Sequence, residues 1–197
     1  MLGLLALDTA FPRIRGDVGA PETFDFPVRV RTVAGALVDD VVHLGHDDAF
    51  PHFVQAAQDL VDDGCIGIAT TCGFLVRWQH ELIAELDVPV LTSALLMLPQ
   101  VQRCLPRQRK VGVVTYSAAA LSPKIVAAAG GDPFLPIEGV DPSGYFAQVV
   151  RHGAAHLDPR RMADDVVAAA RRLVAAHKDV GAIVLECANM PPYRDAV

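Results

Sequence analysis

A short apolar stretch between two helical patterns decides the fold. It reads Cys65-Ile-Gly-Ile-Ala-Thr-Thr-Cys-Gly-Phe74. Its first six residues have the length and composition of a buried strand. Ala49 to Asp62 ahead of it has apolar residues at helical spacing, and Phe74 to Leu86 after it returns to that spacing. A buried strand between two helices is typical of a parallel sheet that is covered by helices.

The same alternation extends along the chain. We expect further strands over Leu2–Leu7, Val28–Val33, Val88–Leu91, Lys110–Thr115, Phe134–Ile137 and Val180–Leu185. We expect further helices over Ser117–Ala129, Ser143–His152 and Pro159–His177. Strands that alternate with helices predict an α/β fold.

A weak internal repeat indicates two similar halves. Leu60 to Gly64 precedes an apolar run that leads to Cys72, and Leu173 to Gly181 precedes a run that leads to Cys187. We therefore expect a first half over residues 1–96 and a second half over residues 97–197. Each would be a short, mostly parallel sheet flanked by helices. Each thiol would then lie at the end of a parallel sheet where ligands bind.

Composition disfavours several classes of protein. Of the 197 residues, 52% are hydrophobic and 20% are charged, so a sizeable core can form. The formal net charge is −6 and no strong basic run occurs, which disfavours a nucleic-acid partner. The longest uncharged stretch, Val88 to Gln102, contains two prolines and falls short of the ~20 residues that span a membrane. Since the first residues also lack a basic leader, we expect a cytoplasmic protein without a membrane partner.

Two of the four cysteines occupy matching turns. Cys72 is followed by Gly73 and a predicted helix, and Cys187 is followed by Asn189 and two prolines. Backbone N–H groups at the start of a helix favour a thiolate and can hold a substrate carboxylate. A buried structural cysteine is the alternative for each thiol taken alone. No Cys-x-x-Cys occurs, which disfavours a zinc ribbon or a thioredoxin-type site.

Four motifs in this order resemble those of the aspartate/glutamate/hydantoin racemase superfamily. They are Leu7-Asp8-Thr9, Thr71-Cys72-Gly73, Val111-Gly-Val-Val-Thr-Tyr-Ser117 and Glu186-Cys187-Ala188-Asn189. The resemblance covers nearly the whole chain, and the loop from Asp8 to Phe26 is similar to that of a largely uncharacterised branch. It implies an active site in the cleft between two α/β halves, with one catalytic cysteine from each half and no cofactor.

The resemblance also implies roles for individual residues. One of Cys72 and Cys187 removes the proton beside a carboxylate as a thiolate, and the other delivers a proton to the opposite face. We expect the substrate to contact Asp8, Thr9, Arg13, Thr71, Gly73, Thr115, Tyr116, Ser117, Ala188 and Asn189. Arg13 belongs to this set because a guanidinium group can bind a carboxylate through two hydrogen bonds. A turn cap is an equally good interpretation of Asp8.

No metal site is expected. His43 with His46, and His152 with His156, have spacings compatible with metal binding, but neither pair comes with a convincing set of further ligands. We interpret both pairs as exposed polar residues.

The chain departs from the family pattern in two places. The glutamate racemase branch has a histidine soon after its second cysteine, and none lies beside Cys187, so glutamate specificity is in doubt. Glu186 is a candidate substitute, or it is simply held beside the strand end. Only ten residues follow Cys187, where family members continue with a helix that returns to the first half. We therefore expect a missing return segment and a homo-oligomer, a dimer, that covers the exposed first half.

The sequence thus predicts a cofactor-independent racemase or isomerase. Its substrate would be a small carboxylate with a reactive α-carbon, an amino acid such as aspartate or glutamate. The alternatives are an arylmalonate decarboxylase-like enzyme, a maleate isomerase-like enzyme and a non-catalytic carboxylate-binding protein. Decarboxylation needs one thiol only, so the presence of both Cys72 and Cys187 favours racemisation.

Overall fold

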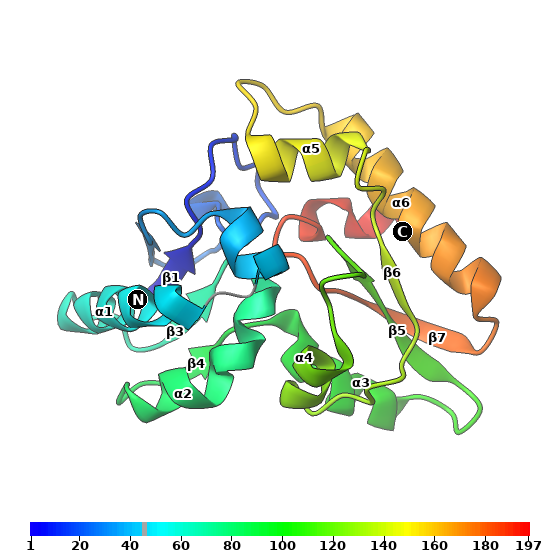
Figure 1. Cartoon of the computed structure of the whole chain (residues 1–197), viewed down its shortest axis with the longest axis horizontal. Helices are drawn as coiled ribbons and strands as arrows, with labels where there is room; N and C mark the ends of the chain where they lie inside the picture. The colour runs from blue at the N-terminus through cyan, green and yellow to red at the C-terminus, as the bar shows by residue number, and fades with distance from the viewer. Residues whose placement is uncertain (45–46) are drawn as a thin grey trace.

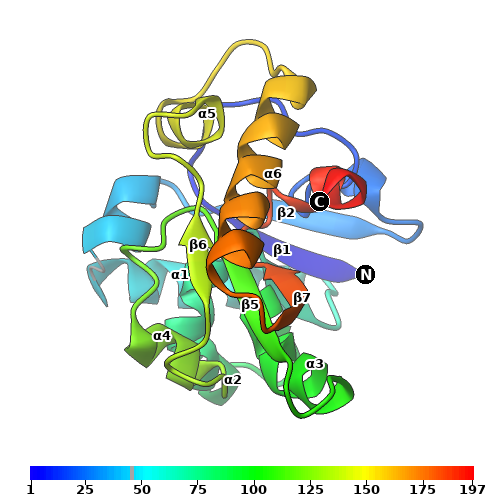
Figure 2. The same ribbon diagram turned by 90° about the vertical axis from the view of Figure 1, so that its right-hand side faces the viewer.

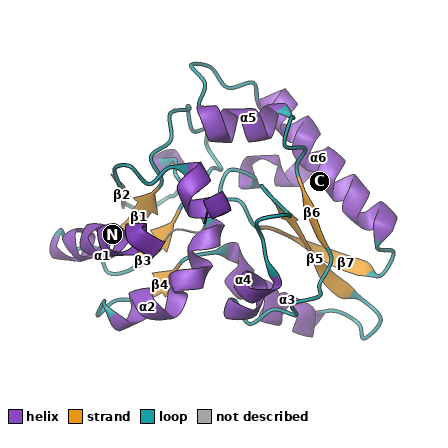
Figure 3. Cartoon of the chain, in the orientation of Figure 1, coloured by secondary structure: helices purple, strands orange, loops and turns teal. Residues whose placement is uncertain are grey.

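The computed structural model describes residues 1–44 and 47–197, and these residues form two parallel sheets that lie side by side (Figure 1). The first sheet has the order β2-β1-β3-β4 and consists of β1 (Leu2–Ala6), β2 (Val28–Thr32), β3 (Ile68–Thr70) and β4 (Val90–Leu91). The second sheet has the order β6-β5-β7 and consists of β5 (Lys110–Thr115), β6 (Ile137–Gly139) and β7 (Val180–Leu185). The α/β fold class is confirmed (Figure 3).

Helices flank both sheets. In the first half, α1 (Phe50–Asp62) packs against β1 and β2, and α2 (Gln79–Ala84) packs against β4. In the second half, α6 (Pro159–Ala176) lies across the β6-β5-β7 sheet, as Figure 2 shows, and α5 (Tyr145–His152) packs on α6. The remaining α-helices are α3 (Leu98–Cys104), which packs against β5, and α4 (Pro123–Ala128).

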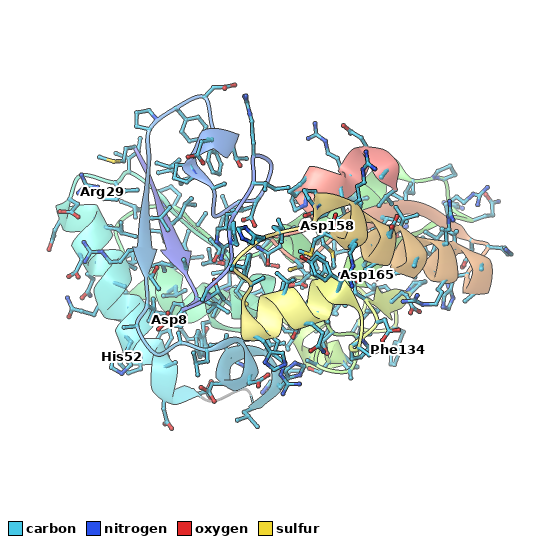
Figure 4. All side chains as sticks on the ribbon, turned by 90° about the horizontal axis from the view of Figure 1, so that it is seen from above. Asp8, Arg29, His52, Phe134, Asp158 and Asp165 are labelled. Carbon is cyan, nitrogen blue, oxygen red and sulfur yellow. The ribbon has the colours of Figure 1, made fainter. Side chains whose placement is uncertain are left out.

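Local chemistry explains where α6 begins and which face it buries. The Asp158 side chain, labelled in Figure 4, accepts hydrogen bonds from the backbone N–H groups of Arg160 and Arg161 at 3.0 and 3.3 Å. Pro159 is the first helical residue, where its missing N–H has no cost. The buried positions recur at helical spacing: Met162, Val166, Ala169, Ala170 and Leu173.

Short helices of other types complete the chain. They include 3-10 helices at Pro21–Thr23, Asp47–Ala49, Gly73–Trp78, Ala94–Met97 and Pro191–Ala196, and a π-helix at Asp39–Leu44. The 3-10 helix Gly73–Trp78 contacts α4 of the second half, and β7 contacts the 3-10 helix Ala94–Met97. These contacts bring the ends of the two sheets together.

Several predicted boundaries were wrong. The helix expected over Ser117–Ala129 begins only at Pro123, because the Ser122 side chain caps it and Leu121 N–H bonds the Ser117 carbonyl in a separate turn. The helix expected over Phe74–Leu86 is divided into a 3-10 helix and α2. The strand expected from Cys65 begins at Ile68, because the backbone N–H of Cys65 bonds Leu60 in the turn after α1.

Two further differences lie in the second half. The strand expected over Phe134–Ile137 lies three residues later, at β6, because Phe134 is held in a turn by the Asp132 side chain and is exposed. Helix α3 was not predicted. Its residues occupy the uncharged stretch whose two prolines we took for interruptions, but Pro99 lies in the first turn of α3, where proline is tolerated.

None of the helices within the described ranges is long and apolar enough to cross a membrane.

Candidate active site

The two thiols occupy equivalent places in the two sheets. Cys72 comes two residues after β3 ends and directly before the 3-10 helix Gly73–Trp78. Cys187 comes two residues after β7 ends. Both cysteines are free and buried, at 7% and 9% exposure, and both line one cavity between the sheets. The carboxyl ends of parallel strands therefore bring together two thiols that lie 115 positions apart in the sequence.

The cavity is small and mostly apolar. Its volume is about 30 Å³, which is room for a water molecule or two at ~10–15 Å³ each and far below the ~300–1,000 Å³ of sites for drug-sized ligands. Besides the thiols, six residues expected or suspected at the site line it: Thr9, Arg13, Thr71, Gly73, Glu186 and Asn189. Tyr116 is a seventh expected residue of the lining. The rest of the wall is apolar and was not expected at the site: Leu7, Val38, Val42, Phe74 and Val150.

Four residues of the expected binding set are not among those that line this cavity. Asp8 lies beyond the end of β1, where its exposed carboxylate accepts a hydrogen bond from Gly35 N–H at 3.0 Å (Figure 4). Asp8 therefore caps a turn, which was the alternative interpretation of this residue. Ser117 accepts from the backbone of its own turn, and Ala188 contributes its carbonyl to Val18 N–H. Thr115 is fully buried and reaches the site only through its hydrogen bond to Glu186.

Glu186 is a buried carboxyl group at the centre of the site. Its side chain is 2% exposed, and Oε2 accepts a hydrogen bond from the Thr115 hydroxyl at 2.7 Å. Oε1 has no hydrogen-bond partner among the described residues. Burial raises the pKa of Glu186 from 4.5 to about 7, although the Thr115 hydroxyl and the backbone N–H of Tyr116 oppose this rise. This carboxyl group therefore titrates near neutral pH.

Gly73 makes room for that carboxyl group. A Cβ atom at Gly73 would lie 2.1 Å from Glu186 Oε1 and 2.8 Å from the Glu186 carbonyl oxygen, closer than atoms can approach. The second half therefore places its carboxyl group directly against the backbone that follows Cys72. The sequence suggested a close approach at Gly73, and the partner in that approach is Glu186.

Cys72 has surroundings that partly favour a thiolate. Burial and the charge of Glu186 raise its pKa to about 12. The backbone N–H groups of Phe74 and Leu75 and the positive charge of Arg77 act in the opposite direction. These donors belong to the 3-10 helix that Cys72 precedes, as expected from the turn.

Cys187 is held as a thiol. Burial raises its pKa well above 9, and the charges of Glu186, Cys72 and Asp17 raise it further. Its Sγ–H donates to Asn189 Oδ1 at 3.5 Å. Burial and Glu186 thus favour the protonated form of both thiols, and at Cys187 the charge of Asp17 adds to this effect while the backbone N–H of Asn189 opposes it.

Asp17 is a site residue that sequence reasoning missed. Its carboxylate is 3% exposed and accepts from Asn189 Nδ2 at 2.7 Å, from Arg13 Nη1 at 2.8 Å and from Gly19 N–H at 2.7 Å. It thereby connects the loop between β1 and β2 to the Asn189 that holds Cys187. Its place between two glycines in a loop predicts a turn, and only the fold shows which side chains it meets.

The remaining polar groups separate into site and non-site residues. Thr71 lines the cavity, and its buried Oγ1 has no partner among the described residues. Cys65 is buried in the core of the first half, and Cys104 is exposed on α3. Within the described ranges no cluster of three His, Cys, Asp or Glu residues could hold a metal ion; His46 lies outside the described residues.

Known structures share this arrangement of two sheets. A mutant of arylmalonate decarboxylase in its sulfate-associated form aligns with a TM-score of 0.60 over 93% of this chain and 76% of its own, at 18% identity. The aspartate racemase of Picrophilus torridus aligns with a TM-score of 0.53 over 98% of this chain and 83% of its own, at 13% identity. The chain thus shares its fold with arylmalonate decarboxylase and with this aspartate racemase.

Proteins of similar sequence carry another activity in their names. A dimethylsulfoniopropionate lyase of Durusdinium sp. clade D is 27% identical over 208 residues, covering all of this chain and 67% of that protein. Dimethylsulfoniopropionate lyases 3 and 7 of Emiliania huxleyi (strain CCMP1516) are 31% and 30% identical over the whole chain, which covers 54% and 60% of them. The chain therefore spans about half to two thirds of the length of these relatives. No protein-family model matches it.

Proposed function

We propose that this chain carries the active site of a cofactor-independent lyase that removes a proton from the carbon beside a carboxylate. The observation that carries the proposal is the small buried cavity lined by Cys72, Cys187 and Glu186. Removal of such a proton is the step that racemisation and β-elimination have in common. The names of the relatives favour elimination from dimethylsulfoniopropionate or a similar small sulfonium carboxylate as the outcome.

Cys72 is the base in this proposal. The backbone N–H groups of Phe74 and Leu75 act toward a thiolate on Cys72, whereas the charge of Asp17 acts against a thiolate on Cys187, whose Sγ–H donates to Asn189 Oδ1. The Cys72 thiolate takes the α-proton, the new C=C bond forms, and the bond from the β-carbon to the sulfonium sulfur breaks with its electron pair. The products are a dialkyl sulfide and an unsaturated carboxylate.

The walls of the cavity fit the two ends of such a substrate. Arg13 supplies positive charge for a carboxylate, and its guanidinium group is fixed by Asp17 and Thr9 at 2.8 and 3.1 Å. The rings of Phe74 and Tyr116 line the same cavity, and aromatic faces attract cations such as a sulfonium group.

Racemisation of a small amino acid is the second candidate, and one observation favours it. Two thiols from opposite halves line one cavity, and racemisation needs an acid–base group on each face of a carbon, whereas elimination needs a single base. In that reaction Cys72 removes the α-proton, and Cys187 delivers a proton to the opposite face of the same carbon.

One experiment decides between the candidates. The full chain is incubated with dimethylsulfoniopropionate while dimethyl sulfide is measured by headspace gas chromatography. In parallel, single enantiomers of aspartate and glutamate are incubated in deuterated water and followed by NMR. We expect release of the sulfide. Deuterium at the α-carbon of an amino acid without sulfide release would establish the racemase instead, and neither signal would overturn both.

A further inference from the structure

The proposed base needs a proton acceptor, because the cavity does not favour a thiolate by itself. Burial and neighbouring charge raise the pKa of Cys72 to about 12 and the pKa of Cys187 well above 9, so at neutral pH both thiols keep their protons. Glu186 is the group of the cavity that is ionised near neutral pH. Two negative charges at short range in a buried site oppose each other. A thiolate therefore forms most easily when Glu186 becomes neutral at the same time.

The geometry points to the side of Glu186 that would accept the proton. Oε2 is occupied by the hydrogen bond from the Thr115 hydroxyl, whereas Oε1 has no partner among the described residues. Oε1 lies against the backbone of Gly73, the residue that follows Cys72, at the place that a Cβ atom would fill. The free oxygen thus faces the turn of Cys72 inside the closed cavity.

We propose that Glu186 activates Cys72 by accepting its thiol proton at Oε1. The Sγ–H bond of Cys72 breaks, the O–H bond of Glu186 forms, and the negative charge moves from the carboxylate to sulfur. After Cys72 has taken the α-proton of the substrate, Glu186 loses its proton to solvent and the starting charge is restored. This inference rests on the proposed function, because it identifies how the base of that reaction is generated.

Cys72 and not Cys187 is the partner of Glu186 in this transfer. Two backbone N–H groups and Arg77 stabilise negative charge on Cys72. The Cys187 thiol donates to Asn189, whose amide is bound by the carboxylate of Asp17. Besides Glu186, the titratable and charged side chains that line the cavity or act on its thiols are Cys72, Cys187, Tyr116, Arg13, Arg77 and Asp17.

The test is the pH dependence of Cys72 alkylation in the full chain. Only the thiolate reacts with iodoacetamide, and peptide mass spectrometry assigns the modified cysteine without any substrate. When Glu186 accepts the proton of Cys72, the pair of side chains keeps the same number of protons. Once one proton has left the pair, the fraction of Cys72 thiolate formed by this transfer therefore does not depend on pH. The rate should therefore rise through pH 7 as the first proton leaves the site and then level off toward pH 9. A wild-type profile with no inflection near pH 7 would overturn the proposal.

Two variants assign that inflection. In Glu186→Gln the acceptor is absent while the oxygen bonded by Thr115 is kept, so the inflection should disappear and the rate should rise continuously with pH. In Thr115→Val the hydrogen bond that favours the charged carboxylate is lost, so the inflection should move to higher pH. Glu22→Gln, on the exposed 3-10 helix Pro21–Thr23, is the matched control and should keep the wild-type profile. An inflection unchanged in both Glu186→Gln and Thr115→Val would overturn the role of Glu186.

Turnover distinguishes this inference from the proposed function. With an active substrate, Glu186→Gln should lower kcat/KM at neutral pH by ~10²-fold, the size of a typical acid–base contribution. If the wild-type chain turns over none of the small carboxylates while its alkylation inflection moves in the variants as described, the proposed function fails and the proton transfer is supported. If turnover is found and Glu186→Gln retains it with an unchanged pH profile, the proposed function stands and the proton transfer fails.

Discussion

Cys72 and Cys187 follow matching strands of two similar sheets, but different groups stabilise or oppose a negative charge on each sulfur. Backbone N–H groups of a 3-10 helix and Arg77 act to lower the pKa of Cys72, against the effects of burial and Glu186. Burial and Glu186 also raise the pKa of Cys187, and the charge of Asp17 raises it further. The backbone N–H of Asn189 opposes this rise. Two equivalent positions in a repeated architecture thus have different charged and polar neighbours.

Contacts with segments outside the two turns add to this difference. Asp17 lies in the loop between β1 and β2, and it binds Asn189 across 172 positions of sequence. Glu186 belongs to the second half, but its carboxyl group lies against Gly73 of the first. The strand ends thus supply the thiols, and the helix after Cys72 together with contacts between the two halves determines which charged and polar groups surround each of them.

The largest effect is expected from removing the proposed base. Cys72→Ala should lower kcat/KM for sulfide release by ~10²–10⁴-fold, the range for loss of an acid–base group. Headspace gas chromatography measures it. Cys104→Ala is the control, because Cys104 is exposed on α3 and distant from the cavity lining, and it should retain wild-type activity. Equal losses in both variants would remove the proposed role of Cys72.

The buried carboxyl group should make stability depend on pH. The folded-state pKa of Glu186, about 7, lies above its ordinary value of 4.5, so the folded state binds this proton more tightly. Its contribution to the free energy of unfolding is fully present below pH 4.5 and is lost as the pH rises through 7. The difference amounts to about 3 kcal/mol at 1.36 kcal/mol per pKa unit.

Urea unfolding checks this expectation. Between pH 4.5 and pH 8, the stability of the wild type relative to Glu186→Gln should fall by about 3 kcal/mol. The control Glu22→Gln should follow the wild type at both pH values, because its side chain is exposed. A constant difference between the wild type and Glu186→Gln would show that Glu186 does not change its proton affinity on folding.

Cys187→Ala sharpens the comparison between the two reactions. If the protein eliminates a sulfide, the Cys187 thiol supplies no proton that the reaction needs, and the variant should lose only about tenfold in kcat/KM, less than an acid–base group typically contributes. If it racemises an amino acid, the loss should equal that of Cys72→Ala. The same assays of sulfide release and α-deuterium exchange measure both outcomes.

The smallest effect is expected at Asp17. Asp17→Asn removes a negative charge that raises the pKa of Cys187, so that pKa should fall and alkylation of Cys187 at pH 9 should become faster. Peptide mass spectrometry measures the rate at each thiol. Asp25→Asn in the same loop is the control, because Asp25 is 96% exposed in its side chain. Slower alkylation of Cys187 in Asp17→Asn would contradict the assigned effect.

Much of the fold could be predicted because its signals are local. Lys110–Thr115 and Val180–Leu185 were predicted with the observed bounds, since each is an apolar run between turns. The helix expected over Ser117–Ala129 failed because apolar residues alone do not mark where a helix begins. Its start depends on Ser122 and Pro123, whose cap competes with the turn before it.

The candidate site was predicted in part for the same reason. The turns after β3 and β7 identify Cys72 and Cys187 from short motifs, and the structure brings both to one cavity. Asp8 follows β1 just as closely, but its carboxylate is used by the backbone of Gly35. A motif gives the position of a side chain along a strand, and it does not give the direction in which that side chain finds its partner.

By itself, the sequence determined the alternation of strands and helices, and hence the α/β class, and the two thiols at the strand ends, because periodicity and turn chemistry act over a few residues. Only the tertiary structure decided which carboxyl group is withdrawn from water beside those thiols and which charge lies near each. Glu186 meets Gly73, and Asp17 meets Asn189, across more than half of the chain. Proton affinity depends on burial and on charges nearby in space, and neither is a property of neighbouring residues in the sequence.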